Sequence, residues 1–153
     1  MTIRCANIND YQTVAEFSRQ IFLNHVENRP DIIKKAPELS KREYKKVLKN
    51  KKWVILIAEK NGQPAGHIKA LIRHVGDKIW TEKNLIHIHE IYVDPSFRRQ
   101  GIASGLLDEI KRIASETGTT QITLDVWSFN ETAIRLYEKL GYTPQRLKLE
   151  LNL

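Results

Sequence analysis

The stretch Arg98-Arg99-Gln100-Gly101-Ile102-Ala103 decides the fold, because it joins an apolar, strand-like segment (86–93) to a helix-like segment (102–115). A glycine at such a junction, with small residues beside it, lets backbone N–H groups converge on an anion at the helix N-terminus. The arginine side chains just before the glycine add fork-shaped donors that suit phosphate oxygens. The stretch therefore predicts a cradle for a diphosphate, although a purely structural turn would use the same residues.

The composition is that of an ordinary globular protein, with 41% hydrophobic and 28% charged residues in a chain of 153. This length, without repeats or linkers, predicts one domain over residues 1–153. The longest apolar run, residues 53–58, is too short to cross a bilayer, and the N-terminus lacks a signal-peptide pattern. The single cysteine, Cys5, cannot form an internal disulfide and does not suggest a metal cluster. We therefore expect a cytoplasmic protein with no metal and no membrane partner.

The net charge is +7, from 25 basic and 18 acidic residues, and much of the excess lies between residues 34 and 52. A positive field attracts anions, so nucleic acid and a phosphorylated cofactor are both candidates. A nucleic-acid surface would interleave aromatic residues with the charges or match a known module. Only Tyr44 and Trp53 lie nearby, and no such module is visible. We favour a solvated helix face, and nucleic acid is not the expected partner.

The hydrophobic pattern predicts a mixed α/β (α+β) fold with the element order βααβββαβαββ. Strands are expected at 2–8, 53–59, 64–74, 86–93, 121–127 and 146–151, and helices at about 10–27, 40–50, 102–115 and 131–140. Asn61-Gly62 is typical of a hairpin turn, and Ser40 with Glu43 predicts a capping box. Strands four and five, joined through a helix, should be parallel neighbours in a mostly antiparallel sheet.

A second stretch, from Asn130 to Tyr142, places three informative residues on one helix. Asn130 can cap the start of the helix, and Ala133 permits a close approach on its inward face. Tyr137 follows two turns after Asn130 on the same face. Gly141 is suited to end this helix, as Gly118 is suited to end the preceding one.

Together these stretches resemble the motifs of the GNAT superfamily of acyl-CoA N-acyltransferases, in a single-domain bacterial-type form. Arg98-x-x-Gly101-x-Ala103 is similar to the family's pyrophosphate motif, and Ile91-Tyr92-Val93-Asp94-Pro95 is similar to the strand before it. Asn130-x-x-Ala133-x-x-Leu136-Tyr137-x-x-x-Gly141-Tyr142 is similar to the second cofactor motif. The resemblance implies the GNAT fold with splayed strands four and five, acetyl-CoA as co-substrate, and N-acetyltransferase activity.

The resemblance also implies a set of residues that bind acetyl-CoA. These are Tyr92, Val93, Arg98, Arg99, Gln100, Gly101, Ile102, Ala103, Ser104, Asn130, Ala133 and Tyr137. The pantetheine arm would pair with strand backbone near Val93, and the diphosphate would lie on N–H groups from Arg99 to Ser104. A substrate amine would attack the acetyl carbonyl directly, and Tyr137 would protonate the leaving thiolate as general acid. An aromatic residue on such a helix is more often a core residue, but the complete motif favours the catalytic role.

The family has no fixed general base, so several candidates stay open. Glu90 is favoured, then Asp125, while His87 and His89 are eligible because imidazole titrates near neutrality. Strand alternation separates Glu90 from the two histidines, but a bulge near the splay would change that assignment. His67 belongs to no motif and is expected to be a surface or structural residue.

The acceptor is expected to be a primary amine: a small amine, an amino-acid derivative or a peptide N-terminus. A homodimer is possible, since dimers are common among the proteins that this chain resembles. The alternative from another class is a non-catalytic acyl-CoA sensor or nucleic-acid-associated protein on the same fold. Its contact surface would be the basic residues 34–52.

Overall fold

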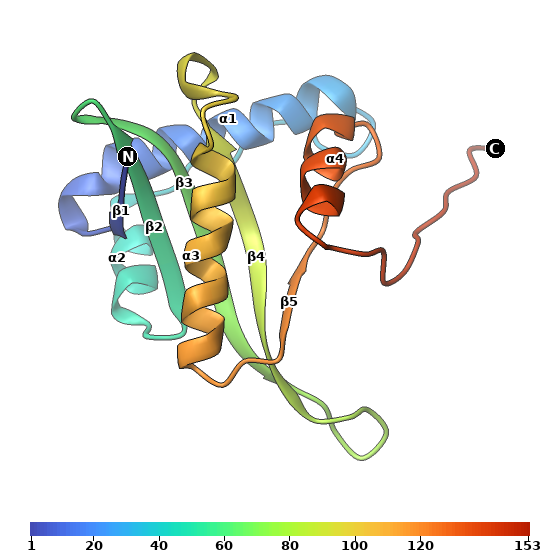
Figure 1. Cartoon of the computed structure of the whole chain (residues 1–153). Helices are drawn as coiled ribbons and strands as arrows, with labels where there is room; N and C mark the ends of the chain where they lie inside the picture. The colour runs from blue at the N-terminus through green and yellow to red at the C-terminus, as the bar shows by residue number, and fades with distance from the viewer.

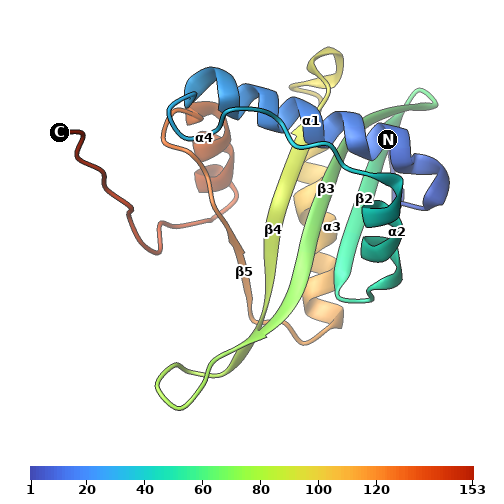
Figure 2. The same ribbon diagram turned by 180° about the vertical axis from the view of Figure 1, so that it is seen from behind.

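The computed structural model describes residues 1–153 as a five-stranded sheet with helices on both faces (Figures 1 and 2). The strands are β1 (Thr2–Cys5), β2 (Trp53–Lys60), β3 (Gln63–Val75), β4 (Lys83–Val93) and β5 (Gln121–Leu124). The helices are α1 (Tyr11–Asn28), α2 (Lys41–Lys49), α3 (Ile102–Glu116) and α4 (Glu131–Lys139), with short 3-10 turns at Ile8–Asp10 and Pro95–Phe97. The strands follow chain order across the sheet; β1 to β4 pair antiparallel, and β4 and β5 pair parallel. The predicted α/β class and the parallel fourth and fifth strands are confirmed.

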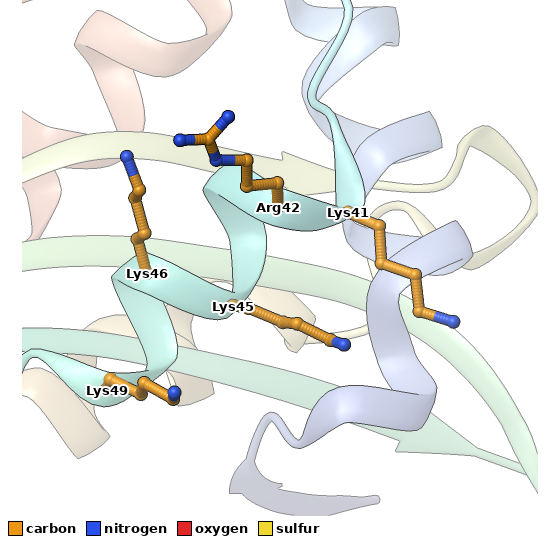
Figure 3. A pocket seen from close by; sticks show the side chains of 5 residues that line it. All are labelled: Lys41, Arg42, Lys45, Lys46 and Lys49. Carbon is orange, nitrogen blue, oxygen red and sulfur yellow. The ribbon is translucent and has the colours of Figure 1, made fainter.

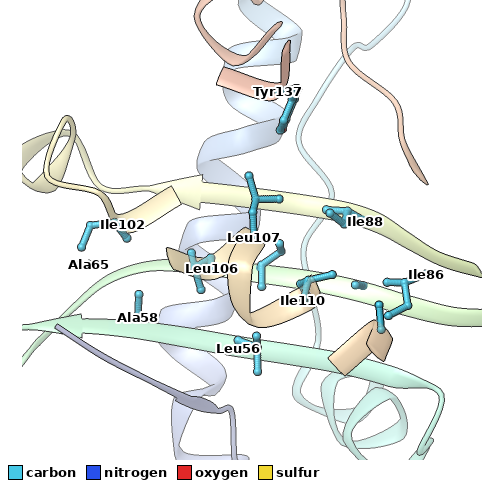
Figure 4. Close-up of a cluster of buried hydrophobic side chains, with 13 residues drawn as sticks. Leu56, Ala58, Ala65, Ile86, Ile88, Ile102, Leu106, Leu107, Ile110 and Tyr137 are labelled. Atoms are coloured by element: carbon cyan, nitrogen blue, oxygen red, sulfur yellow. The ribbon is translucent and has the colours of Figure 1, made fainter. Parts of the chain in front are cut away.

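The sheet separates two apolar layers. Helix α3 covers one face, and α1 with α2 covers the other, while α4 lies beyond the end of β5 (Figures 1 and 2). Ile102, Leu106, Leu107 and Ile110 of α3 recur about every turn and are fully buried against β2, β3 and β4 (Figure 4). On the opposite face Tyr44 of α2 is buried with Val14, Ile55 and Ile57. The larger cluster lies under α3 and therefore supports the turn at its N-terminus.

Local signals explain most of the element boundaries. Asn61 (φ 53°) and Gly62 (φ 74°) both adopt the left-handed conformation that a two-residue hairpin turn requires. Ser40 Oγ accepts a hydrogen bond from Glu43 N at 3.2 Å, and Glu43 Oε2 accepts one from Ser40 N at 2.9 Å. The predicted hairpin and the predicted capping box are therefore both confirmed.

The first strand and the fifth strand are shorter than predicted. β1 ends at Cys5 rather than residue 8, because the Asp10 carboxylate accepts a hydrogen bond from Asn7 N and closes a turn there. β5 ends at Leu124 rather than residue 127, because β4 no longer lies beside it and offers no ladder. The end of β1 and the end of β5 are therefore each set by hydrogen-bonding groups that lie outside the strand itself.

The predicted closing strand at 146–151 is wrong. Residues 142–153 form neither helix nor strand, and they run away from the sheet (Figures 1 and 2). The structure therefore has five strands, whereas six strand ranges were predicted and the predicted element order contains seven. Alternation of apolar and polar residues makes a strand only where a second backbone supplies hydrogen bonds, and no strand pairs with this segment.

Candidate functional site

The sheet opens between β4 and β5. These strands pair only from Leu85 with Gln121 to Ile88 with Leu124. β4 continues to Val93 with β3 on one side alone, so its other edge is free of a strand partner over residues 89–93. An extended ligand can add to such an edge through backbone hydrogen bonds. The parting of the two strands that the family resemblance implied is therefore present.

The turn before α3 has the conformation of an anion cradle. Arg99 (φ 58°) and Gly101 (φ 81°) both lie in the left-handed region, where glycine avoids the strain that a side chain brings. No side chain caps α3, whose N-cap is Gly101, whereas Ser40 caps α2 and Asn130 caps α4. The first N–H groups of α3 therefore have no side-chain acceptor, and the helix dipole adds positive potential there. A Cβ at Gly101 would meet nothing within 4 Å, so the space beside this residue is open.

Contacts from three segments hold the cradle in place. Arg98 Nε donates to the Val93 carbonyl at 3.3 Å, which ties the turn to the end of β4. Gln100 Nε2 donates to the Ser96 carbonyl at 3.1 Å. Lys60, at the end of β2, donates from Nζ to Gln100 Oε1 at 2.6 Å and adds a positive charge beside the turn. Sequence reasoning missed Lys60, because no motif signals a residue 40 positions away.

Some of the predicted cofactor-binding residues have side chains that pack inside the protein, so only their backbone groups are available to a ligand. The Ile102 side chain is 1% exposed and belongs to the core under α3. The Tyr92 ring packs on Phe17 of α1, with 4.9 Å between ring centroids. Asn130 Oδ1 accepts a hydrogen bond from Ala133 N at 3.3 Å, so its predicted role as a helix cap is confirmed.

Tyr137 lies at the edge of the core beneath α4, near Leu107 of α3 (Figure 4). Its ring is 8% exposed and packs on Tyr142, with 5.6 Å between ring centroids. Burial raises the pKa of Tyr137 to about 12. The phenol is therefore protonated at neutral pH and can act as a proton donor.

Glu90 belongs to a largely buried polar network between α1, β3 and β4, and its side chain is 11% exposed. Its carboxylate accepts hydrogen bonds from Ser18 Oγ at 2.5 Å and from Lys69 Nζ at 3.1 Å. Burial alone would raise the pKa of Glu90, but Lys69, His67 and Ser18 outweigh it and hold the pKa below its usual value. These contacts stabilise the charged form, which makes this carboxylate a weak proton acceptor.

His67 of β3 is fully buried beside Glu90, with 3.6 Å between His67 Nε2 and Glu90 Oε2. Neither ring nitrogen has a hydrogen-bond partner in the protein, and the ring packs edge-on against Phe17. Burial lowers the pKa of His67 to about 4, so the ring is neutral at physiological pH. His67 is therefore a structural residue, one of the two kinds expected from the sequence.

A β-bulge places the remaining base candidates near the opening. The register of β3 and β4 shifts so that Lys69 faces Glu90 and Ala70 faces Ile88, which leaves His89 as the extra residue. The His89 ring contacts the ring of His87, with 4.8 Å between centroids. The bulge breaks the simple alternation of side chains at the first β4 residue beyond its pairing with β5.

His87 links this bulge to β5. Its Nδ1 lies 2.9 Å from Thr123 Oγ1, and its Nε2 lies 3.7 Å from Asp125 Oδ2. The Asp125 side chain is 85% exposed, directly after the end of β5. Partial burial, then His87 and Lys69, lower the pKa of His89, which favours its neutral form. The structure therefore brings Asp125, His87 and His89 together and ties Glu90 to a separate network.

A basic surface lies on α2, on the other side of the sheet from α3 (Figures 1 and 2). Lys41, Arg42, Lys45, Lys46 and Lys49 extend from this helix, as Figure 3 shows. None of these five side chains takes part in an ion pair of the structure. Residues 34–52 hold nine basic and two acidic residues, and the rest of the chain holds sixteen of each sign. The whole net charge of +7 is thus concentrated in this segment.

Residues 20–142 match the acetyltransferase (GNAT) family. The chain belongs to this family. Among curated relatives, a thialysine N-epsilon-acetyltransferase of Sus scrofa is 39% identical over 62 residues, which cover 40% of this chain and 36% of that protein. An N-acetyltransferase of Methanocaldococcus jannaschii is 29% identical over 99 residues, which cover 65% of this chain and 43% of that protein. The chain thus spans less than half the length of either relative.

Solved structures agree with the GNAT fold. The BH1408 protein of Bacillus halodurans, solved as a tetramutant, aligns with a TM-score of 0.92 and 26% identity over 100% of both chains. An aminoglycoside N-acetyltransferase in complex with CoA aligns with a TM-score of 0.76 and 18% identity over 99% of this chain and 98% of that one. Acetyl transfer is the chemistry of the family that residues 20–142 match. None of its helices combines the length and apolar character that spanning a bilayer requires.

Proposed function

We propose that this protein is an acetyl-CoA-dependent N-acetyltransferase that acts on a primary amine. The observation that carries the proposal is the uncapped N-terminus of α3 beside the opening between β4 and β5. The first feature offers backbone donors to a diphosphate, and the second offers a strand edge to an extended arm. One ligand that contains both parts, a coenzyme A thioester, would satisfy both. The catalytic domain would comprise residues 1–153.

Acetyl-CoA would supply a thioester whose carbonyl carbon is open to attack by an amine. The N–H groups from Arg99 to Ser104 would bind the diphosphate, with Arg98 and Lys60 adding positive charge. Backbone groups of Tyr92 and Val93 would hold the extended arm. Asn130 and Ala133 at the start of α4 would line its other side.

Tyr137 would hold the proton that the leaving sulfur needs, because its raised pKa keeps the phenol protonated. The amine must lose a proton, and Asp125 with His87 is better placed to accept it than Glu90. Asp125 is exposed at the opening, whereas Lys69 and Ser18 already occupy the Glu90 carboxylate. Glu90 would instead position Lys69 and the bulge. His89, neutral beside His87, would extend the route for the proton.

The acceptor would be a small amine, an amino-acid derivative or a peptide N-terminus. Thialysine and aminoglycosides appear in the names of similar proteins, and both carry primary amines. A large polycation would favour an acidic pocket, whereas residues 34–52 beside the sheet face are strongly basic. We further propose a reducing, cytoplasmic setting, which suits the exposed and unpaired Cys5.

The test is release of free CoA thiol from acetyl-CoA in the presence of a panel of amines. We expect release with at least one acceptor, and severe loss of acetyl-CoA binding in Gly101→Glu, which places a negative charge in the cradle. Gly118→Glu is the matched control, because Gly118 is also left-handed (φ 64°) with open space around it but ends α3. Equal acetyl-CoA affinity in both variants would refute the cradle. Cofactor binding without thiol release across the panel would refute the transferase.

The concentrated charge of α2 favours a second candidate, an acyl-CoA-binding protein that contacts nucleic acid. Unpaired lysines on one helix can neutralise backbone phosphates, and such binding weakens steeply with salt. RNA binding with a steep salt dependence that is lost in Lys45→Glu/Lys49→Glu, combined with no thiol release, would support this candidate. Thiol release without RNA binding would exclude it.

A further inference from the structure

The general-base candidates lie on the face of the sheet opposite to α3. Ile86 and Ile88 of β4 pack in the core under α3, so the His87 side chain between them points to the other face. His87 contacts Asp125, which places both proton acceptors of the proposed reaction on that face. The acceptor amine must therefore approach from the side of α1 and α2, a conclusion that rests on the proposed acetyl transfer.

No helix covers the part of this face nearest the β3–β4 hairpin. α1 and the segment that follows it cross the far end of the sheet, and α2 lies over β2 (Figure 2). The half-buried side chains of Trp53 and Leu71 are opposite each other on β2 and β3, and Leu71 is opposite His87 on β4. Trp53 and Leu71 therefore form an apolar surface between the base candidates and the hairpin.

Two cations without acidic partners lie at the hairpin end of this apolar surface. Arg73 is opposite Leu85 and Lys83 is opposite Val75, so the two cationic side chains share a face and are diagonal neighbours. Arg73 is exposed, and neither cation takes part in an ion pair of the structure. Like charges held side by side repel each other, so an anionic group that binds both would relieve the repulsion.

Arg73 is close to the base candidates, and its charge is not neutralised. Lys69, another cation on this face, pairs with Glu90 at 3.1 Å. Burial is the main cause of the lowered pKa of His89, and the positive charge of Arg73 contributes to it. Arg73 can therefore bind an anionic group of a molecule whose amine lies at the base candidates.

The spacing along β4 sets the length of such a molecule. Leu85, opposite Arg73, lies three residues before Ile88, where the pairing with β5 ends. Three residues of a strand span about 10 Å. An arginine side chain covers part of this distance, and the acceptor must cover the rest. In an α-amino acid one carbon carries both the amine and the carboxylate, so the molecule is too short, whereas an amine on a chain of several carbons is long enough.

We propose that the acceptor carries an anionic group at the end of its chain opposite to the amine, and that Arg73, with Lys83 beside it, binds this group. The guanidinium offers paired N–H donors that suit the oxygens of a carboxylate or a phosphate. The carbon chain of the acceptor would lie on Trp53 and Leu71, with the amine near Asp125. A second amine in place of the anionic group would be repelled by both cations.

Amines with the same carbon chain and different far ends test the proposal. Pentylamine is neutral at its far end, 1,5-diaminopentane is cationic, and 6-aminohexanoate and 5-aminopentyl phosphate are anionic. We expect kcat/KM for the better anionic acceptor to exceed that for pentylamine by about tenfold, because hydrogen bonds to charged groups contribute at least this factor. The diamine should be the poorest acceptor. The comparison of the two anionic acceptors distinguishes a carboxylate from a phosphate.

Variants of Arg73 assign this preference to one side chain. Arg73→Gln should bring the ratio of anionic to neutral acceptor close to one, mainly through KM, and Arg73→Lys should keep most of the preference. The matched control is Lys78→Gln, which removes one positive charge from the exposed loop between β3 and β4 and should leave the ratio unchanged. A wild type without the preference, or a preference that survives Arg73→Gln, would overturn the proposal. An equal loss in Lys78→Gln would also overturn it.

Binding measured by NMR without an acetyl donor separates failure of this proposal from failure of the transferase. Titration with 6-aminohexanoate or 5-aminopentyl phosphate should shift the amide signals of residues 71–74 and 83–87 in the wild type, and Arg73→Gln should abolish these shifts. If no amine is acetylated, the proposed function fails, and the shifts still decide whether the anionic group is bound. Absence of the shifts in the wild type with both probes would overturn the proposal.

Discussion

Protonation of His67 should make this protein sensitive to mild acid. The ring is 0% exposed, and neither of its nitrogens has a protein hydrogen-bond partner. Protonating the His67 ring in the folded protein would place a positive charge away from water. Burial therefore lowers its pKa from 6.5 to about 4 despite the nearby Glu90 carboxylate. In the unfolded chain the ring regains its ordinary pKa. Between these two values the unfolded state therefore binds more protons than the folded state, so stability falls as the pH falls.

The size of the effect follows from the two pKa values. The full difference, from 6.5 to about 4, corresponds to about 3 kcal/mol once the pH is below both. At pH 5 about 2 kcal/mol of the free energy of unfolding should already be lost relative to pH 8. Asp10, whose pKa the Arg4 hydrogen bond lowers below 3.8, should lose its contribution only at lower pH. The pKa values of His25 and His89 are also lowered by burial, so these residues add to the trend in the same direction.

Urea unfolding measures the contribution of His67 to the pH dependence of stability. The wild type and His67→Leu would be compared at pH 8, 7, 6 and 5 at constant ionic strength. His25 and His89 are present in both proteins, so the difference between the curves reports His67. We expect the variant to lose about 2 kcal/mol less than the wild type between pH 8 and pH 5. At pH 8 the two should agree within about 1 kcal/mol, because leucine replaces two unpartnered polar atoms with apolar ones. Parallel pH curves for the two proteins would refute the reasoning.

Three further changes test the site and its supports. Tyr137→Phe should lower the rate of acetyl transfer more than acetyl-CoA affinity, by roughly 10²-fold where chemistry limits turnover, and an unchanged single-turnover rate would assign Tyr137 to packing alone. Gly66→Ala should destabilise the fold by about 1–3 kcal/mol and weaken acetyl-CoA binding, because its Cβ would lie 2.5 Å from the Tyr92 carbonyl oxygen and displace β4 at the opening. Gly105→Ala is its control: there the Cβ meets the end of the flexible Met1 side chain, so calorimetric titration should find normal affinity. Ser40→Ala should cost about 1 kcal/mol in urea unfolding through loss of the α2 cap while leaving thiol release unchanged, and a stability equal to wild type would contradict the capping role.

Elements whose hydrogen bonds join residues close together in the sequence could be predicted from it. The Asn61-Gly62 hairpin needs two left-handed residues, and those two types adopt that conformation most easily. The Ser40 cap and the Gly101 turn are equally local. Elements that need a distant backbone were less predictable. β5 ends where β4 no longer lies beside it, and the segment 146–151 has the residue pattern of a strand but pairs with no strand.

The residues of the candidate site also fall into those predictable from the sequence and those placed by distant segments. The positions of Gly101, Asn130 and Tyr137 follow from motifs in which each residue acts through its own turn or helix face. The sequence favoured Glu90 over Asp125 as the general base, but it could not show the bulge at His89 or the Lys69 side chain of another strand that pairs with Glu90. Lys60 reaches the turn before α3 only because the fold brings the end of β2 within hydrogen-bond distance of Gln100.

The amino-acid sequence by itself determined the helices, the hairpin and the turn at Gly101, because each rests on interactions between near neighbours in the chain. Its local motifs also indicated membership of the GNAT family. Only the tertiary structure decided the place of the bulge, the pairing of Glu90, the approach of Lys60 and the exposure of the C-terminal leucines. These depend on registers and distances between segments far apart in the chain. Such contacts form only after the sheet has assembled, and no local pattern of residues encodes them.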